Sequence, residues 1–164
     1  MLDRIFPKQF DNTYRGHWLG VALFVPIVLL KAIQGVNSII MTRQIMTSAD
    51  GIPLDSFNSA AAQNAIADFA LLGMYLLIIP LIGAISLIRY RAMIPFLYLM
   101  LLLQQIGSRF ILLAHPVPRT GAYDAAPIGL YVNLGILAVT VIGFALSLLS
   151  KRGARAPALA ENAS

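Results

Sequence analysis

The chain has 164 residues and a formal net charge of +5, and its composition is strongly apolar. Hydrophobic residues make up 59% and charged residues 12%, against roughly 45–50% and about 25% in soluble domains. This composition excludes an ordinary soluble domain, which needs far more surface charge, and indicates a chain that lipid solvates. The absence of cysteine excludes disulfides, thiolate catalysis, iron–sulfur clusters and thiolate zinc sites.

Four apolar stretches are long enough to cross the ~30 Å hydrocarbon core of a bilayer as helices, which takes about 20 residues each. They cover about residues 17–41, 65–88, 93–114 and 128–149. Lys31 interrupts the first stretch, whose uninterrupted part has the length of a signal-peptide core, but no small-residue cleavage site follows it. The apolar pattern continues beyond Lys31, so we expect an uncleaved span. The sequence therefore predicts an all-α, polytopic membrane protein, a four-helix transmembrane bundle with short loops.

Polar connections separate these spans. The first connection, residues 42–59, carries the turn signal Gly51-Ile52-Pro53. Ser56 or Ser59 is a candidate N-cap for the second helix. The second connection is a tight basic turn, and the third, residues 115–127, is a loop rich in proline and glycine.

The chain accordingly divides into three segments. We expect residues 1–16 to form a cytoplasmic N-terminal segment and residues 17–150 to form the four-helix transmembrane domain. Residues 151–164 are mostly small, and we expect them to form a disordered cytoplasmic tail.

The basic residues predict the orientation of the spans. They lie in short groups that flank the apolar stretches, which is typical of membrane orientation and not of a nucleic-acid surface. If the N-terminus is cytoplasmic, the outer loops hold only Arg43 and Arg119. The inner side then holds Arg4, Lys8, Arg15, Arg89, Arg91, Lys151, Arg152 and Arg155. Because positive residues prefer the cytoplasmic side, we expect both termini in the cytoplasm and the chain in the inner (plasma) membrane.

Small residues at helical spacing predict where the helices pack closely. Gly16 and Gly20 are four residues apart, and so are Gly143 and Ser147. Small side chains at this spacing let two backbones approach each other.

Polar groups are expensive at membrane depth, so they are the best candidates for a site. Residues 31, 34 and 38 share one face of the first helix, and residues 105, 108 and 109 share one face of the third. Both groups fall in the outer half of the membrane, and an acidic residue enters the second helix from the same side. We expect them to face one another, because amides facing hydrocarbon would lack hydrogen-bond partners. The candidate ligand-binding residues are Lys31, Gln34, Asn37, Asp68, Gln105 and Arg109.

Two interpretations of this cluster stay open. In a binding site, the two cations Lys31 and Arg109 face the single embedded carboxylate of Asp68. The one excess positive charge could hold an anionic group. In a structural cluster, Lys31 extends to the outer interface and the amides hold helices together. Arg109 is then neutralised by Asp68 or by a loop carboxylate from Asp50, Asp55 or Asp124. The sharpest expectation is an ion pair between Asp68 and Arg109, since arginine suits a two-pronged bond to a carboxylate.

The sequence predicts no catalytic residues, no metal site and no cofactor. It has no paired carboxylates at one depth of the bundle, and its two histidines, His17 and His115, lie near opposite membrane surfaces. This favours a small non-enzymatic integral membrane protein, an accessory or scaffold subunit that contacts the lipid bilayer and another membrane protein or copies of itself. The alternative is a binder or carrier of a small anionic amphiphile, such as a lipid or a quinone-like molecule, in a polar cavity in the outer half of the bundle.

Overall fold

The computed structural model describes residues 2–116 and 128–149, and within these ranges the regular structure is entirely helical. There are four long helices in these ranges, and short helical segments connect the first to the second and the second to the third. The helices are α1 (Leu2–Ile5), α2 (Trp18–Ile40), α3 (Thr42–Gln44), α4 (Ser59–Arg89), α5 (Ile94–Ala114) and α6 (Ile128–Leu148). A π-helical turn (Ile45–Ala49) and 3-10 turns (Leu54–Ser56 and Arg91–Met93) complete them. The predicted tail, 151–164, and most of the predicted loop, 115–127, lie outside the described residues.

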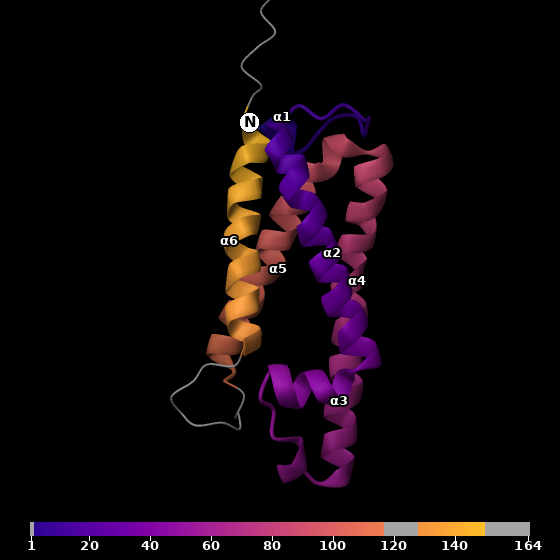
Figure 1. The fold of residues 1–164 in the computed structure, drawn as a ribbon, viewed down its shortest axis with the longest axis vertical. Helices are drawn as coiled ribbons and strands as arrows, with labels where there is room; N and C mark the ends of the chain where they lie inside the picture. Colours follow the sequence, from indigo (N-terminus) through magenta and orange to yellow (C-terminus); the bar gives the residue numbers. More distant parts are fainter. Residues whose placement is uncertain (1, 117–127, 150–164) are drawn as a thin grey trace, which may run out of the picture.

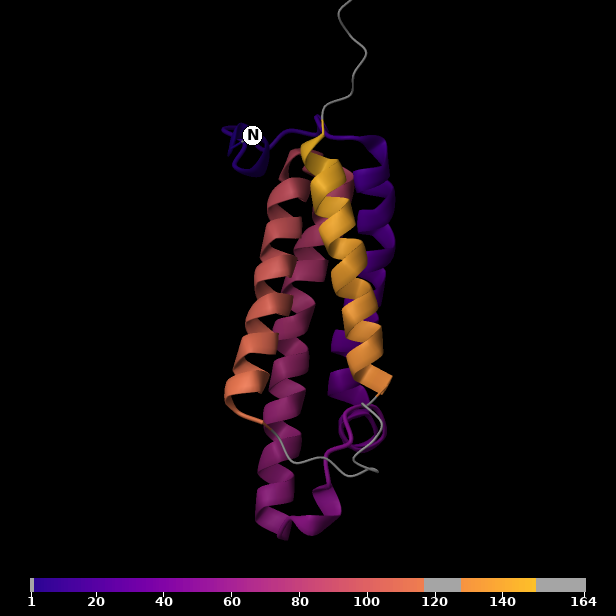
Figure 2. The same ribbon diagram turned by 90° about the vertical axis from the view of Figure 1, so that its left-hand side faces the viewer.

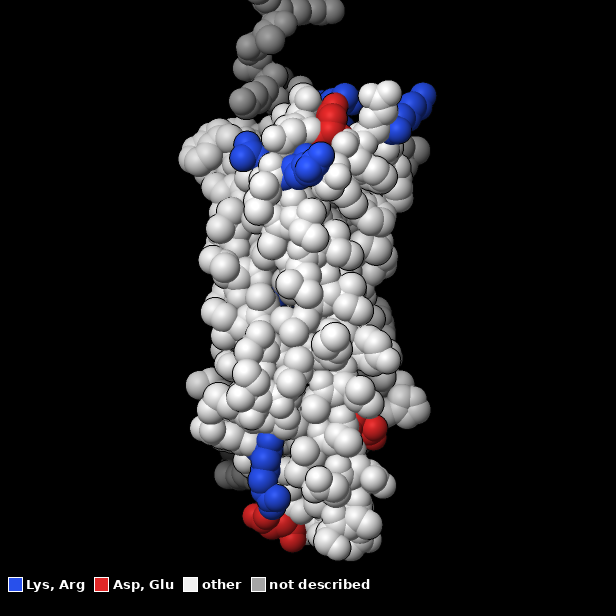
Figure 3. All heavy atoms as spheres, turned by 90° about the vertical axis from the view of Figure 1, so that its right-hand side faces the viewer, with Lys and Arg blue, Asp and Glu red and all other residues white. Residues whose placement is uncertain are grey.

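The four long helices are each long and apolar enough to span a membrane, which confirms the predicted fold class. They lie side by side in an elongated bundle (Figures 1 and 2). The large hydrophobic side chains that point out of the bundle are numerous on all four helices. On the face that Figure 3 shows, charged side chains gather toward the two ends and leave an apolar belt between them. Such a belt is the surface that hydrocarbon solvates.

The helix α4 begins at Ser59, close to the start that the candidate caps predict, and it extends the apolar stretch 65–88 at its N-terminal end. Its N-cap is Asn58, whose side-chain oxygen accepts a hydrogen bond from the Ala61 amide at 2.8 Å. The prediction of Ser56 or Ser59 as the cap was wrong. Asparagine caps helices at least as well as serine, and the alanines that follow have the highest helix propensity.

One half of the bundle is packed solid. Phe24 of α2 and Tyr98 of α5 are fully buried and meet edge to face, with ring centroids 5.0 Å apart. The Tyr98 hydroxyl donates a hydrogen bond to the Gly20 carbonyl oxygen at 2.8 Å. The rest of this core is aliphatic and comes from α2, α5 and α6: Ile27, Val28, Ile94, Leu97, Leu101 and Ile136. No charged side chain takes part in this core cluster.

The predicted close approach of small residues is confirmed in this half. A Cβ added to Gly16 would collide with the carbonyl oxygen of Ser147, and one added to Gly20 would lie 3.1 Å from the Ser147 amide nitrogen. The chain just before α2 therefore touches the end of α6 through backbone. The His17 amide donates to the Leu146 carbonyl at 3.2 Å across the same contact.

The other half of the bundle is splayed. Figure 1 shows α6 moving away from α2 toward the end that carries α3, and Figure 2 shows α5 and α6 separating toward the same end. The connection predicted as a polar loop lies across this end as the short helices between residues 42 and 56. Met46 and Leu54, each 2% exposed, hold this crossing segment (residues 42–57) to the bundle. Gly51 has a φ of 68°, which confirms the predicted turn there.

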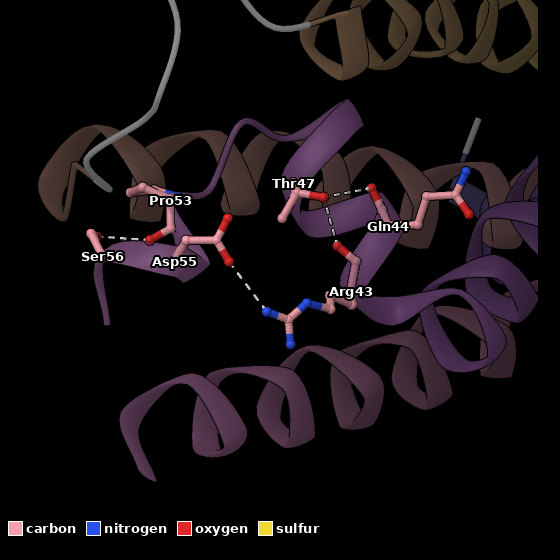
Figure 4. Close-up of polar contacts among 6 residues, drawn as sticks. All are labelled: Arg43, Gln44, Thr47, Pro53, Asp55 and Ser56. Carbon is pink, nitrogen blue, oxygen red and sulfur yellow. Dashed lines mark hydrogen bonds and ion pairs between the residues drawn. The ribbon is translucent and has the colours of Figure 1, made fainter. Parts of the chain in front are cut away.

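Polar contacts stabilise the crossing segment on its outer side. Arg43 donates to Asp55 at 3.3 Å, and this ion pair joins its two ends (Figure 4). Both side chains are largely exposed, so the pair is worth at most about 1 kcal/mol. Thr47 donates to the Arg43 carbonyl at 3.0 Å, and Ser56 donates to the Pro53 carbonyl at 2.7 Å.

Candidate functional site: a cavity in the splayed half

The splayed half contains a cavity of about 560 Å³ that is open on part of its surface. All four long helices and the crossing segment contribute to its wall. Its polar lining consists of Lys31, Gln34, Asn37, Ser38, Asp50, Gln104, Gln105, Ser108, Arg109 and Asn133. Five of the six predicted site residues are among these, and Asp68 is not.

The α2 wall of the cavity is a polar stripe. Lys31, Gln34, Asn37 and Ser38 follow one another along it at helical spacing. Lys31 is 4% exposed, although it carries a charge. The ion pairs among the described residues are Arg15–Asp11 and Arg43–Asp55, so Lys31 has no carboxylate partner in this part of the chain.

The α5 wall of the cavity is a second polar stripe. Gln105, 8% exposed, donates to the Leu101 carbonyl at 3.3 Å and to the Thr140 hydroxyl oxygen at 3.2 Å. These bonds fix the amide group of Gln105 between α5 and α6, and its side-chain oxygen is buried without a partner. Arg109 donates to the Leu130 carbonyl of α6 at 3.4 Å. Gln105 therefore supports helix packing, whereas the charged group of Arg109 forms its hydrogen bond within the described residues to a backbone oxygen alone.

The other two walls are mainly apolar. The helix α4 contributes Phe69, Leu72 and Leu76, and α6 contributes Leu130, Val132 and Leu137 among others. Polar α2 and α5 stripes and apolar α4 and α6 surfaces thus alternate around one space. An amphiphilic molecule presents the same two kinds of surface.

The crossing segment lines the cavity beside α6. Ala49 and Asp50 lie against Gly129, where an added Cβ would be 3.0 Å from the Ala49 carbonyl oxygen and 3.0 Å from a carboxylate oxygen of Asp50. The backbones can approach this closely because position 129 has no side chain. Asp50 is the carboxylate that lines the cavity.

The predicted ion pair between Asp68 and Arg109 is not formed. Asp68 is exposed, lies outside the cavity lining and has no ion pair with any described residue. The neighbouring residue, Phe69, lines the cavity instead. Because successive residues of a helix point about 100° apart, Phe69 facing inward turns Asp68 away.

Some of the lining had no place among the predicted site residues. Asn133 lines the cavity from α6, where its amide nitrogen donates to the Gly129 carbonyl at 2.9 Å. It is the single amide residue of a mostly apolar helix, which was a usable signal. Asp50 was expected only as one of the loop carboxylates near Arg109, because a polar residue in a connection is ordinary.

Comparisons with known proteins add no relative to this description. No family model, no curated protein and no solved structure matches the chain.

Proposed function

We propose that this multi-pass membrane protein binds or carries a small anionic amphiphile, such as a lipid or a quinone-like molecule, in the cavity of its splayed half. The observation that carries this proposal is the cavity of about 560 Å³ with Lys31 and Arg109 in its wall. Small-molecule sites typically measure about 300–1,000 Å³ and combine an apolar lining with a few placed polar groups. The cavity has this size and this mixture.

Charge favours an anionic group over a neutral one. Among the described residues, the lining holds two cations, Lys31 and Arg109, and one carboxylate, Asp50. Charged groups inside membrane proteins pair with one another or mark a substrate site, because leaving them in hydrocarbon is costly. A carboxylate or phosphate on the ligand would relieve the excess of positive charge, and its hydrocarbon part would lie on the apolar surface of α4 and α6.

The accessory or scaffold function remains the competing proposal. It fits a polar cluster that is packed solid, since amides then act only as contacts between helices. Gln105 behaves in that way through its bonds to Leu101 and Thr140. The space in front of Lys31 and Arg109 supports the ligand-binding proposal instead.

Native mass spectrometry of gently extracted protein tests the proposal, because it reports bound lipid and oligomeric state together. We expect a retained anionic amphiphile that is lost in Lys31→Gln and in Arg109→Gln. Arg43→Gln is the matched control, because Arg43 is exposed on the crossing segment and does not line the cavity. Equal retention by all four proteins would overturn the proposal, and a stoichiometric second protein would favour the accessory function.

We also propose that both termini face the cytoplasm and that the cavity lies in the outer half of an inner (plasma) membrane. Eight basic residues against two on the opposite side support this orientation. Reporter fusions after Arg91 and at the C-terminus should read cytoplasmic, and one at Asp124 should read external. A cytoplasmic signal at Asp124 would contradict the orientation.

A further inference from the structure

The polar lining of the cavity stops abruptly at one depth. The buried face of α2 changes character at Lys31, because Phe24, Ile27 and Val28 before it are apolar and Gly35 and Ser38 after it are small or polar. The stretch from Lys31 to the end of α2 at Ile40 is about 13 Å long at ~1.5 Å per residue. Half of a ~30 Å hydrocarbon core is close to that length. Lys31 therefore lies near the middle of the membrane.

The other end of the bundle is sealed beyond this depth. Phe24 and Tyr98 are both 0% exposed and meet edge to face across the bundle, and the bond from Tyr98 to the Gly20 carbonyl fixes that contact. The close contact of Gly20 with Ser147 closes the space between the same half of α2 and α6. Apart from the Tyr98 hydroxyl, which is bonded to Gly20, the buried side chains of this core cluster are apolar and offer a charged group no polar partner.

An ammonium group at mid-membrane needs either a counter-ion or water. Lys31 has no carboxylate partner among the described residues, and it faces a space far larger than the ~30 Å³ that one water occupies. Between Lys31 and the α3 end of the helices, the cavity wall carries further polar groups. They come from Gln34 and Asn37 on α2 and from Ser108 and Arg109 on α5. These groups can hydrate the cavity from the end that carries α3.

We propose that the cavity is a one-sided aqueous vestibule, open only from the α3 end, in which Lys31 is the innermost anion-binding residue. The nature of the ligand in this inference rests on the proposed function, whereas the side from which the cavity opens does not. The anionic group of a ligand enters from the α3 end and passes Arg109, which lies about 7.5 Å from the end of α5 at ~1.5 Å per residue. It stops at Lys31, because the Phe24–Tyr98 contact blocks the way further.

Single-cysteine labelling tests the sidedness, and the chain has no native cysteine that would interfere. Gln34→Cys and Ser108→Cys place thiols in the two polar walls, and the second change is nearly isosteric. Ser48→Cys marks the α3 end and Thr13→Cys marks the opposite end, since both residues are exposed. Ile27→Cys, in the closed core, is the negative control.

We expect a membrane-impermeant anionic thiol reagent to modify positions 34 and 108 from the side on which it modifies position 48. The same reagent applied on the side of position 13 should leave both unmodified, and position 27 should not react from either side. Modification from both sides, from the side of position 13, or from neither would overturn the vestibule. Unchanged thermal stability of Ser108→Cys shows that the labelled protein is folded.

The role of Lys31 is tested by the charge preference of the reaction. In the Gln34→Cys protein, an anionic thiol reagent should react severalfold faster than a cationic one. Adding Lys31→Gln to this variant should remove the preference for the anionic reagent. Adding Lys8→Gln, the control, should leave the preference in place. A preference that survives Lys31→Gln would overturn the assignment. Protection of position 34 by dodecyl phosphate tests the proposed function separately. One-sided labelling without protection would leave the vestibule standing and contradict the amphiphile.

Discussion

Gly35 of α2 and Gly73 of α4 lie face to face where these two helices cross. A Cβ added to Gly73 would lie 3.0 Å from the Gly35 carbonyl oxygen, and one added to Gly35 would lie 3.1 Å from the Gly73 carbonyl oxygen. Ser38 and Leu77 fill the space beside the two glycines. Small residues at a crossing let backbones approach without a driving force from water, which is how helices associate in lipid. This contact sets the α2–α4 pair against which the other two helices splay.

Gly73→Ala should destabilise the bundle. The new Cβ would come within 2.8 Å of the Ser38 Cβ as well as 3.0 Å of the Gly35 carbonyl oxygen, and neither is the end of a flexible side chain. Overpacking of this kind costs about 1–3 kcal/mol, and the better helix propensity of alanine returns at most about 1 kcal/mol. Thermal unfolding in detergent should show a lower midpoint.

Gly107→Ala and Gly135→Ala provide the matched controls, since an added Cβ at either position meets nothing within 4 Å. Both lie inside helices, α5 and α6, so alanine should leave the midpoint unchanged or raise it. Equal losses in all three variants would mean that the α2–α4 crossing is not special.

The contrast between the two sets of glycines shows what the sequence could predict about packing. Gly16 and Gly20 stand one turn apart on the same side of the chain, so the pattern is visible without knowing the partner. Gly35 and Gly73 lie on different helices, and neither has another glycine one turn away. Their pairing depends on the crossing point of α2 and α4, which no local pattern encodes.

The site, too, could be predicted only in part. Hydropathy predicts the number of spans, and helical spacing predicts the polar faces of α2 and α5 and their common depth. The structure places both faces on one cavity. The rotation of α4 about its axis cannot be predicted in the same way, because apolar residues occur on all its sides and mark no face as the inner one. That is why Asp68 was assigned to the site although Phe69 occupies the lining.

Asp68→Ala and Arg109→Leu should act independently. Asp68 is exposed and forms no ion pair with a described residue, so its removal should change stability by no more than about 0.5 kcal/mol. In a double-mutant cycle the two effects should add to within about 0.3–0.5 kcal/mol. A coupling energy above about 1 kcal/mol, measured by thermal unfolding, would restore the ion pair of the sequence-based expectation.

Two tyrosines near Gly20 should respond oppositely to loss of the hydroxyl. Tyr98 donates to the Gly20 carbonyl, so Tyr98→Phe should cost about 0.5–1.5 kcal/mol. The hydroxyl of Tyr14 is buried without a partner, and this burial raises the pKa of Tyr14 to about 12. Tyr14→Phe should therefore leave stability unchanged or raise it, because an unsatisfied buried hydroxyl carries a desolvation penalty. A larger loss in Tyr14→Phe than in Tyr98→Phe would contradict this assignment of the two hydroxyls.

Lys31→Met should stabilise the ligand-free protein. Lys31 is 4% exposed and has no carboxylate partner among the described residues, so its charge opposes folding unless a ligand neutralises it. Replacing buried ions by packed hydrophobic residues stabilises proteins by about 1–4 kcal/mol, and water in the vestibule places this case at the lower end. The unfolding midpoint of delipidated protein should therefore rise, while Lys8→Met, an exposed control, should stay within about 0.5 kcal/mol of wild type. The same Lys31 variant should lose the stabilisation that wild type gains from added dodecyl phosphate, because a ligand stabilises only the fold that binds it. If Lys31→Met instead lowers the midpoint as a core substitution does, Lys31 holds the helices together, and its charge is not kept for a ligand.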